Sequence, residues 1–127
     1  MVYIVTNAFA ILVATCAGLA VGAGYAALQG WRGHPPIVIG TIAVAEFWLA
    51  CILAGALILA PPQAGAWTMA LGSAVIIWIG FVAPTLIVTT LFDGVPIRRG
   101  FLNIAHWLIV MLVQAAVLES FGLVRPT

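Results

Sequence analysis

Apolar residues in this chain gather in four long runs separated by short polar segments. The runs cover residues 2–28, 37–59, 67–90 and 101–121. A bilayer core of about 30 Å is crossed by about 20 helical residues, so each run is long enough to span it. Backbone groups in lipid must be hydrogen-bonded within their own helix. The pattern therefore predicts an all-α membrane protein in which residues 1–127 form a single integral membrane domain of four transmembrane helices.

The segments between the runs are rich in residues that favour turns. The first, residues 29–36, holds two glycines and two prolines, and the second run ends at Pro61 and Pro62. The third connection carries Asp93 and Gly94, a pair typical of turns. Loops this short force neighbouring helices to run antiparallel. We therefore expect an up-down four-helix bundle.

Composition supports lipid as the solvent of this chain. Apolar residues make up 65% of the sequence and charged residues 6%, and the mean hydropathy is +1.28. A soluble domain of this size has to cover its surface with far more polar groups. The net charge of +1 and the lack of a basic stretch argue against nucleic-acid binding. No metal-binding pattern, nucleophile elbow or phosphate loop is present, so the sequence gives no support for an enzyme.

The four arginines suggest an orientation. Arg32, Arg98 and Arg99 fall in the first and third connections, which share one side of a four-helix bundle, whereas Arg125 falls on the other side. Positive residues favour the cytoplasmic side of a membrane. We therefore expect a multi-pass protein with the first and third connections in the cytoplasm and both termini on the outer side of the membrane.

A stripe of small residues runs along the first helix at four-residue spacing. Small side chains let helix backbones approach closely, which drives helix association in lipid. We expect the stripe to be a helix-packing seam within one monomer, ahead of the alternative that it is a contact between copies. Its members are Ala10, Ala14, Gly18, Gly22 and Ala26.

Glu46 is the one acidic residue deep inside an apolar run, since Glu119 lies near the end of the fourth. Glu46 lies nine residues into the second predicted helix, which corresponds to about 13 Å from the first connection. An ionised acid at that depth costs several kcal/mol, and intramembrane acids often mark proton or substrate pathways. Glu46 is therefore a candidate proton-coupling or substrate-binding group. The alternative is a protonated acid that donates one structural hydrogen bond to a neighbouring helix.

Other polar side chains are predicted to lie at a similar depth. Asn103, His106 and Gln114 fall within about 80° on one face of the fourth helix. With Glu46 they suggest a polar pocket that opens toward the first and third connections. The alternative role, preferred for the threonines and Gln114, is interhelical hydrogen bonding worth about 0.6 kcal/mol per contact. The expected pocket residues are Tyr25, Glu46, Thr85, Thr89, Asn103 and His106.

The residue order also resembles a family of bacterial membrane proteins. Residues 80–85 read Gly-Phe-Val-Ala-Pro-Thr and residues 91–96 read Leu-Phe-Asp-Gly-Val-Pro, and they are followed by Arg98 and Asn103. These motifs resemble a bacterial four-helix membrane family that is a domain of unknown function (number seventeen sixty-one). The resemblance implies a four-helix protein of the bacterial inner (cytoplasmic) membrane, for which the expected outer side of both termini is the periplasm. It supplies no activity, and it does not extend to the helix that holds Glu46. The N-terminal part of the chain also matches the residue pattern of this family, at Asn7, Ala10, Gly18, Gly22, Tyr25 and Trp31.

Three classes of function remain open at this stage. The main prediction is a structural or accessory subunit that packs in a homo-oligomer or a larger membrane complex, because the inventory of reactive groups is small. The alternative is a small oligomeric proton-coupled transporter that uses Glu46. The third and least supported class is a membrane enzyme or cofactor holder. No cofactor is evident, although His106 is a candidate axial ligand for a tetrapyrrole metal.

Overall fold

The chain folds into helices throughout the part that the structure describes. The computed structural model describes residues 2–31, 33–61 and 63–125, and Arg32, which entered the orientation argument, lies outside them. These residues form no strand. The elements are α1 (Val2–Thr6), α2 (Ala8–Leu28), α3 (Pro36–Leu59), α4 (Ala66–Ile77), the π-helical turn η1 (Trp78–Val82), α5 (Ala83–Phe92) and α6 (Ile97–Phe121).

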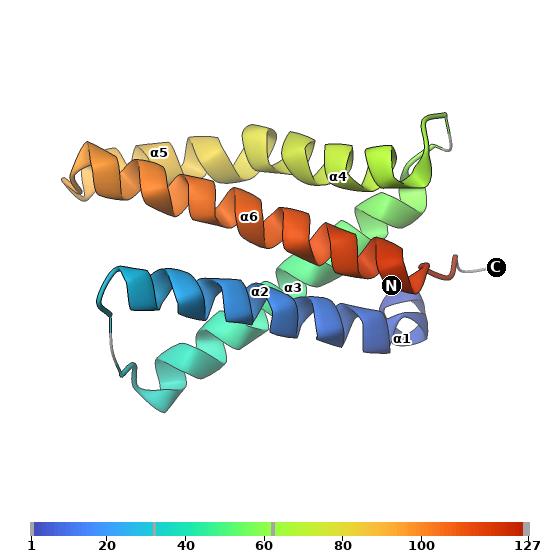
Figure 1. The fold of residues 1–127 in the computed structure, drawn as a ribbon, viewed down its shortest axis with the longest axis horizontal. Helices are drawn as coiled ribbons and strands as arrows, with labels where there is room; N and C mark the ends of the chain where they lie inside the picture. The colour runs from blue at the N-terminus through green and yellow to red at the C-terminus, as the bar shows by residue number, and fades with distance from the viewer. Residues whose placement is uncertain (1, 32, 62, 126–127) are drawn as a thin grey trace.

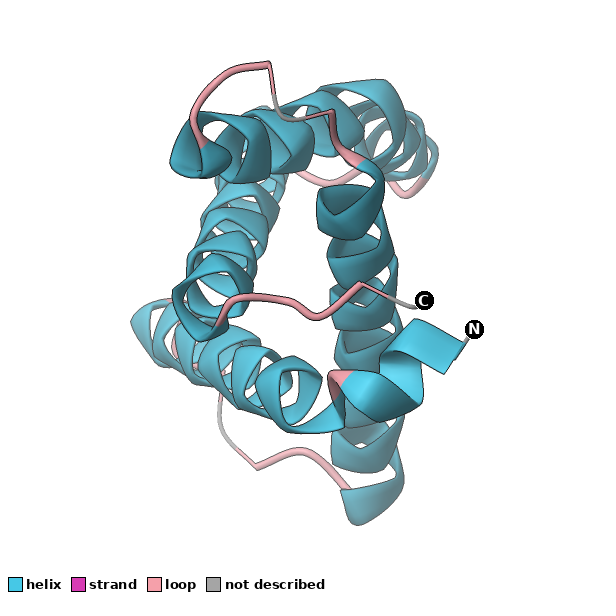
Figure 2. Ribbon diagram, turned by 90° about the vertical axis from the view of Figure 1, so that its right-hand side faces the viewer, coloured by secondary structure: helices cyan, strands magenta, loops and turns pink. Residues whose placement is uncertain are grey.

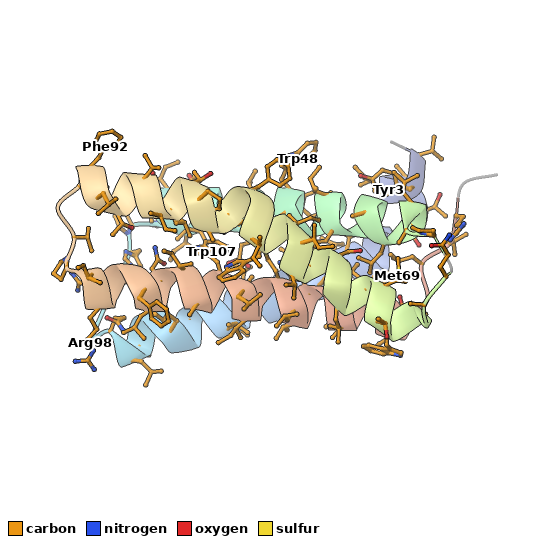
Figure 3. All side chains as sticks on the ribbon, turned by 90° about the horizontal axis from the view of Figure 1, so that it is seen from above. Tyr3, Trp48, Met69, Phe92, Arg98 and Trp107 are labelled. Carbon is orange, nitrogen blue, oxygen red and sulfur yellow. The ribbon has the colours of Figure 1, made fainter. Side chains whose placement is uncertain are left out.

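Four of these helical stretches are long and apolar enough to cross a membrane. They are α2, α3, the continuous stretch Ala66–Phe92 and α6. Successive helices run in opposite directions, so the α2–α3 and α5–α6 connections meet at one end of the bundle, at the left in Figure 1. The predicted four-helix up-down membrane bundle is therefore confirmed. Figure 3 marks the two ends with labelled residues, and we call them the Arg98 end and the Tyr3 end.

Two predicted helix boundaries differ from the structure. The first run is broken at Asn7, which separates the five-residue α1 from α2. The last helix begins at Ile97, four residues earlier than expected, because Pro96 has an extended backbone (φ −55°, ψ 140°) that precedes the first turn. Proline is well suited to that position, since the first turn of a helix does not need its missing N–H. Arg98 and Arg99 therefore belong to the first turn of α6.

The third membrane helix contains a wider turn near its middle. Pro84 has no N–H to donate to the carbonyl of Gly80, so the regular ladder is interrupted there. The chain responds with the π-helical turn η1, and the Ala83 N–H donates to the carbonyl of Trp78, five residues back. The Trp78 indole N–H donates to the carbonyl of Ile104 at 2.9 Å, which fixes this turn against α6.

The apolar core occupies the half of the bundle nearer the Tyr3 end. The largest fully buried side chains there come from α2, α3 and α6, and α2 packs most extensively on α6. Small residues on α2 and α3 allow this close contact between helices. By contrast, the first ten residues of α3 are exposed except for Ala43, which is half-buried. The large core residues are Ile11, Leu53, Val110, Met111 and Leu118.

Asn7 joins the segment that follows α6 to the start of α2. Its side-chain oxygen accepts a hydrogen bond from the Val124 N–H at 2.7 Å, and its amide donates to the Val124 carbonyl at 2.9 Å. The same amide also donates to the carbonyl of Tyr3. The segment after α6 therefore crosses the Tyr3 end of the bundle, as Figure 2 shows.

Candidate functional site

Glu46 lies in the interior of the bundle near the middle of α3. Its side chain is 2% exposed. The helix that faces it is α2, which presents glycine at two successive turns, Gly18 and Gly22. A carboxyl group can therefore lie directly against the α2 backbone, where any larger residue would fill the space.

The two glycines differ in how closely polar groups approach them. A β-carbon placed on Gly18 would lie 2.5 Å from both the Glu46 Oε2 and the Gln114 Nε2 atoms. A β-carbon placed on Gly22 would lie 3.6 Å from Glu46 Oε1 and 3.8 Å from His106 Nε2, which is ordinary van der Waals distance. Gly18 is thus required by the present packing, whereas Gly22 leaves room beside the carboxyl and imidazole groups.

His106 is held between aromatic side chains. Its ring stacks on the Tyr25 ring with centroids 4.3 Å apart and planes 13° apart. Trp107 lies on the same helix with its ring centroid 5.1 Å from that of His106. Stacking of this kind fixes the imidazole plane, and Nε2 lies beside Gly22.

We call Tyr25, Glu46, His106 and Gln114 the Glu46 cluster. Glu46, His106 and Gln114 are each at least nine-tenths buried. Native proteins pair almost all buried polar atoms, so unpaired ones call for an explanation. Within the described residues, six buried polar atoms have no hydrogen-bond partner, and all belong to this cluster: the Tyr25 hydroxyl, Glu46 Oε2, both His106 nitrogens, and Gln114 Nε2 and Oε1.

Aromatic residues continue the cluster toward the Arg98 end. The Trp31 ring lies 6.2 Å from the Tyr25 ring, and the Arg99 guanidinium lies over Trp31 at 5.7 Å from its centroid. Toward the Tyr3 end the cluster meets the apolar core. The polar half of the interior therefore lies nearer the end that carries the α2–α3 and α5–α6 connections.

The structure brings together only part of the predicted pocket. Tyr25, Glu46 and His106 are neighbours, and Asn103 is half-buried one turn before His106. Thr85 and Thr89 are exposed and do not join them, so this part of the prediction is wrong. The physical reason is the rotation of α5 after the π-helical turn, and the Thr85 hydroxyl donates to the Phe81 carbonyl of its own helix at 2.6 Å.

The sequence predicts another role for Gln114 and for the two glycines beside the Glu46 cluster. For Gln114 the sequence favours a structural role in interhelical hydrogen bonding, although this residue shares a helix face with His106. Gly18 and Gly22 were expected only in the packing seam. The seam itself points inward, with Ala10, Ala14 and Gly18 buried and with Gly22 and Ala26 half-buried. One feature of the sequence could have indicated that α2 belongs to the site. The stripe has glycine, rather than alanine, at the two positions level with Glu46.

Metal and cofactor binding have little support in the geometry. No group of three or more histidine, cysteine or acidic residues is placed to hold a metal ion within the described parts of the chain. Tetrapyrrole ligation by His106 stays a prediction. The His106 ring is covered by Tyr25 on one face and its Nε2 atom faces the α2 backbone, so a macrocycle would have to displace α2.

A concave site lies at the Tyr3 end. It has a volume of about 490 Å³ and lies between the α3–α4 connection and the segment after α6. Glu119 and Arg125 line it together with apolar residues such as Leu57 and Met69. This pocket is open at the rim of the bundle and does not reach the Glu46 cluster.

Comparisons of the chain with protein-family models, with curated proteins and with solved structures found no match. The resemblance to the four-helix family of unknown function therefore stays a proposal that rests on the motifs alone. The class of protein does not depend on that resemblance. The chain is a small multi-pass membrane protein with four apolar helices and a buried polar cluster.

Proposed function

We propose that the protein is a small proton-coupled transporter of the bacterial inner membrane and that Glu46 binds the coupling proton. The observation that carries this proposal is the burial of Glu46 at mid-helix with a carboxyl oxygen that has no partner among the described residues. An acid in that position costs several kcal/mol and is typical of proton and substrate pathways in membranes. A purely structural acid would be expected to donate or accept a hydrogen bond to an adjacent helix.

The surroundings of Glu46 support the same proposal. The imidazole of His106 and the carboxyl group of Glu46 both lie beside Gly22, each within van der Waals distance of a β-carbon placed there. A neutral imidazole can accept and donate a proton, so the pair is suited to proton exchange. The aromatic residues Tyr25 and Trp31, which continue from the cluster toward the Arg98 end, support an access route at that end.

The proposal includes a homo-oligomer. Carriers alternate access by moving one repeat or bundle against another around a central site. This chain supplies one bundle of four helices, so a second copy would provide the body against which it moves.

Proton coupling is tested by flux measurements with the purified protein in vesicles that contain a pH-sensitive dye. A panel of cationic, neutral and anionic solutes is added outside under an imposed pH gradient. We expect at least one solute class to drive proton movement in the wild type and none to do so in Glu46→Gln. The control is Glu119→Gln, which changes an acid at the rim. If no solute moves protons, or if Glu46→Gln keeps the response, the transporter proposal is wrong.

An accessory-subunit role is the second candidate, and one observation favours it. Residues 36–45 of α3 are exposed around the whole helix apart from the half-buried Ala43, so partner helices would find free faces there. Native mass spectrometry after mild detergent extraction should then reveal larger subunits that copurify. Gly40 has nothing within 4 Å of a β-carbon, so Gly40→Leu should disrupt such a complex and leave the monomer folded. Extraction of the chain alone would contradict this role.

A further inference from the structure

Three of the six unpaired polar atoms of the Glu46 cluster can accept hydrogen bonds, whereas the Gln114 amide nitrogen and the second imidazole nitrogen donate and the Tyr25 hydroxyl can do both. A carboxylate accepts only, and an amide oxygen and the unprotonated nitrogen of a neutral imidazole also accept. Glu46, Gln114 and His106 therefore offer at least three acceptors from two helices to one small region beside Gly18 and Gly22. A ligand that carries several donors would satisfy atoms that have no partner within the described chain.

The charges around the cluster favour a cation. The described cationic side chains are Arg98, Arg99 and Arg125, and all three are exposed at the ends of the bundle. Arg99 is engaged with the Trp31 ring. An anion at the cluster would meet no compensating positive charge and would be repelled by an ionised Glu46, whereas a cation would offset the buried carboxylate.

Few titratable groups face Glu46 from the helices that pack on α3. On α2 the group is Tyr25, and on α6 it is His106. The described part of α4 contributes no acidic, basic or histidine residue. Cys51 lies on α3 itself, more than one turn beyond Glu46. Glu46 is thus the one acidic group in the cluster, and a single positive charge neutralises it.

We propose that the ligand of the Glu46 cluster is a small cation that donates hydrogen bonds, of the guanidinium or primary ammonium class, and that it competes with a proton for Glu46. This inference rests on the proposed transport function, since it names the substrate class of the same site. The exchange is balanced in charge: the protonated carboxyl releases its proton to water, and the carboxylate then pairs with the cation. No covalent bond other than the O–H bond changes.

Gly22 lies where one small group can contact both Glu46 and His106. A methyl group at this position would lie within van der Waals distance of both Glu46 Oε1 and His106 Nε2. Gly22→Ala should therefore fold and yet occupy the position from which one ligand atom contacts both groups. Gly24, on the same helix, has nothing within 4 Å of a β-carbon. Gly24→Ala is the matched control.

The test measures how fast the hydrophobic carbodiimide dicyclohexylcarbodiimide labels Glu46 in vesicles, because this reagent attacks protonated carboxyl groups. Mass spectrometry of the peptide that holds Glu46 gives the rate, and the peptide that holds Glu119 is the internal reference. Three probes of similar size are compared at equal ionic strength: guanidinium, its neutral isostere urea, and tetramethylammonium, which has charge but no donor. Guanidinium at ten times its Kd should slow labelling about elevenfold, because about one site in eleven stays free.

We expect urea and tetramethylammonium to leave the labelling rate unchanged. Gly22→Ala should lose the guanidinium effect, and Gly24→Ala should keep it. Protection by urea, or equal labelling with and without guanidinium, would overturn the inference, and this comparison in the wild type decides it even if Gly22→Ala fails to fold.

The flux assay separates this inference from the transporter proposal. If a neutral or anionic solute drives Glu46-dependent proton movement, transport stands and the cation class is wrong. If guanidinium protects Glu46 while no solute moves protons, the cation site stands and transport is wrong.

Discussion

Gly18 sets the position of the polar groups that come from two other helices. Its missing side chain lets Glu46 and Gln114 reach the backbone of α2, where a β-carbon would lie 2.5 Å from a polar atom of each. Neither group can withdraw easily, because both are buried in closely packed surroundings. At this scale the structure is determined by one absent side chain.

Gly18→Ala should therefore destabilise the protein by about 1–3 kcal/mol, as overpacking of a well-packed core does. The measurement is the midpoint of thermal unfolding in detergent micelles. Gly24→Ala on the same helix should show no loss, because its β-carbon meets no atom within 4 Å. Equal melting points for the two variants would contradict the packing described for Gly18.

Part of the candidate site could be predicted from the sequence, because residue counting gives the depth of a side chain in the membrane and the helix face on which it lies. Glu46 and His106 could be placed at similar depth from their distance to the connections, and the structure makes both neighbours of Gly22. Thr85 and Thr89 could not be placed, because residue counting assumes a regular helix and the turn before Pro84 is wider. A side chain's depth follows from residue number, but its direction depends on every turn before it.

At the scale of elements, the π-helical turn η1 and helix α6 are linked through one side chain. The Trp78 indole donates to the Ile104 carbonyl at 2.9 Å. That bond holds the third membrane helix against α6 at the level where its ladder is interrupted. The four membrane-spanning helices could be predicted from the apolar runs. The π-helical turn could not, because its form depends on how the chain relaxes around Pro84.

Trp78→Phe should lower the free energy of unfolding by about 0.5–1.5 kcal/mol, the contribution of one hydrogen bond between protein groups. The comparison variant is Trp48→Phe, since Trp48 is 52% exposed and lies on α3. Chemical denaturation in micelles, followed by circular dichroism, gives the difference. A loss of equal size in both variants would mean that the Trp78 bond contributes nothing specific.

Asn7 performs a similar role between α2 and the segment after α6. It exchanges two hydrogen bonds with the Val124 backbone, and its position at the break between α1 and α2 places its amide at the end of the bundle. Polar residues near a helix start are common in sequence, and nothing in the pattern indicated a partner 117 positions away.

Asn7→Ala should cost about 1–3 kcal/mol, because the Val124 N–H and carbonyl would lose their side-chain partner in a partly buried place. Thermal unfolding in micelles is again the measurement. Thr6→Ala serves as the control, since the Thr6 hydroxyl bonds only to the Val2 carbonyl at an exposed position. If protease cuts the segment after α6 at the same rate in Asn7→Ala and wild type, the proposed attachment is wrong.

At the scale of the whole molecule, the two halves of the interior differ in polarity. The Glu46 cluster extends toward the Arg98 end through Tyr25 and Trp31, whereas large apolar side chains fill the half nearer the Tyr3 end. The arginines show the same asymmetry among described residues, with Arg98 and Arg99 at one end and Arg125 at the other. The polar half of the interior and the more basic rim thus coincide.

From the positive-inside tendency we propose that the Arg98 end lies in the cytoplasm. Alkaline phosphatase, which is active only outside the cytoplasm, should be active when fused after residue 125 and inactive when fused within residues 93–96. A green fluorescent protein fusion at the same two points should give the opposite result. The reverse pattern would put the Arg98 end, and with it the proposed access route, on the periplasmic face.

The arrangement of the cluster also has a consequence for biosynthesis. Glu46 enters the membrane with α3, but His106 and Gln114 belong to α6, which the ribosome translates after the other three membrane helices. A nascent or truncated chain that stops before Ile97 therefore carries an acid in lipid that lacks two of its eventual neighbours. Membrane quality-control proteases that detect such a group can distinguish unfinished chains from finished ones, because insertion of α6 conceals the acid.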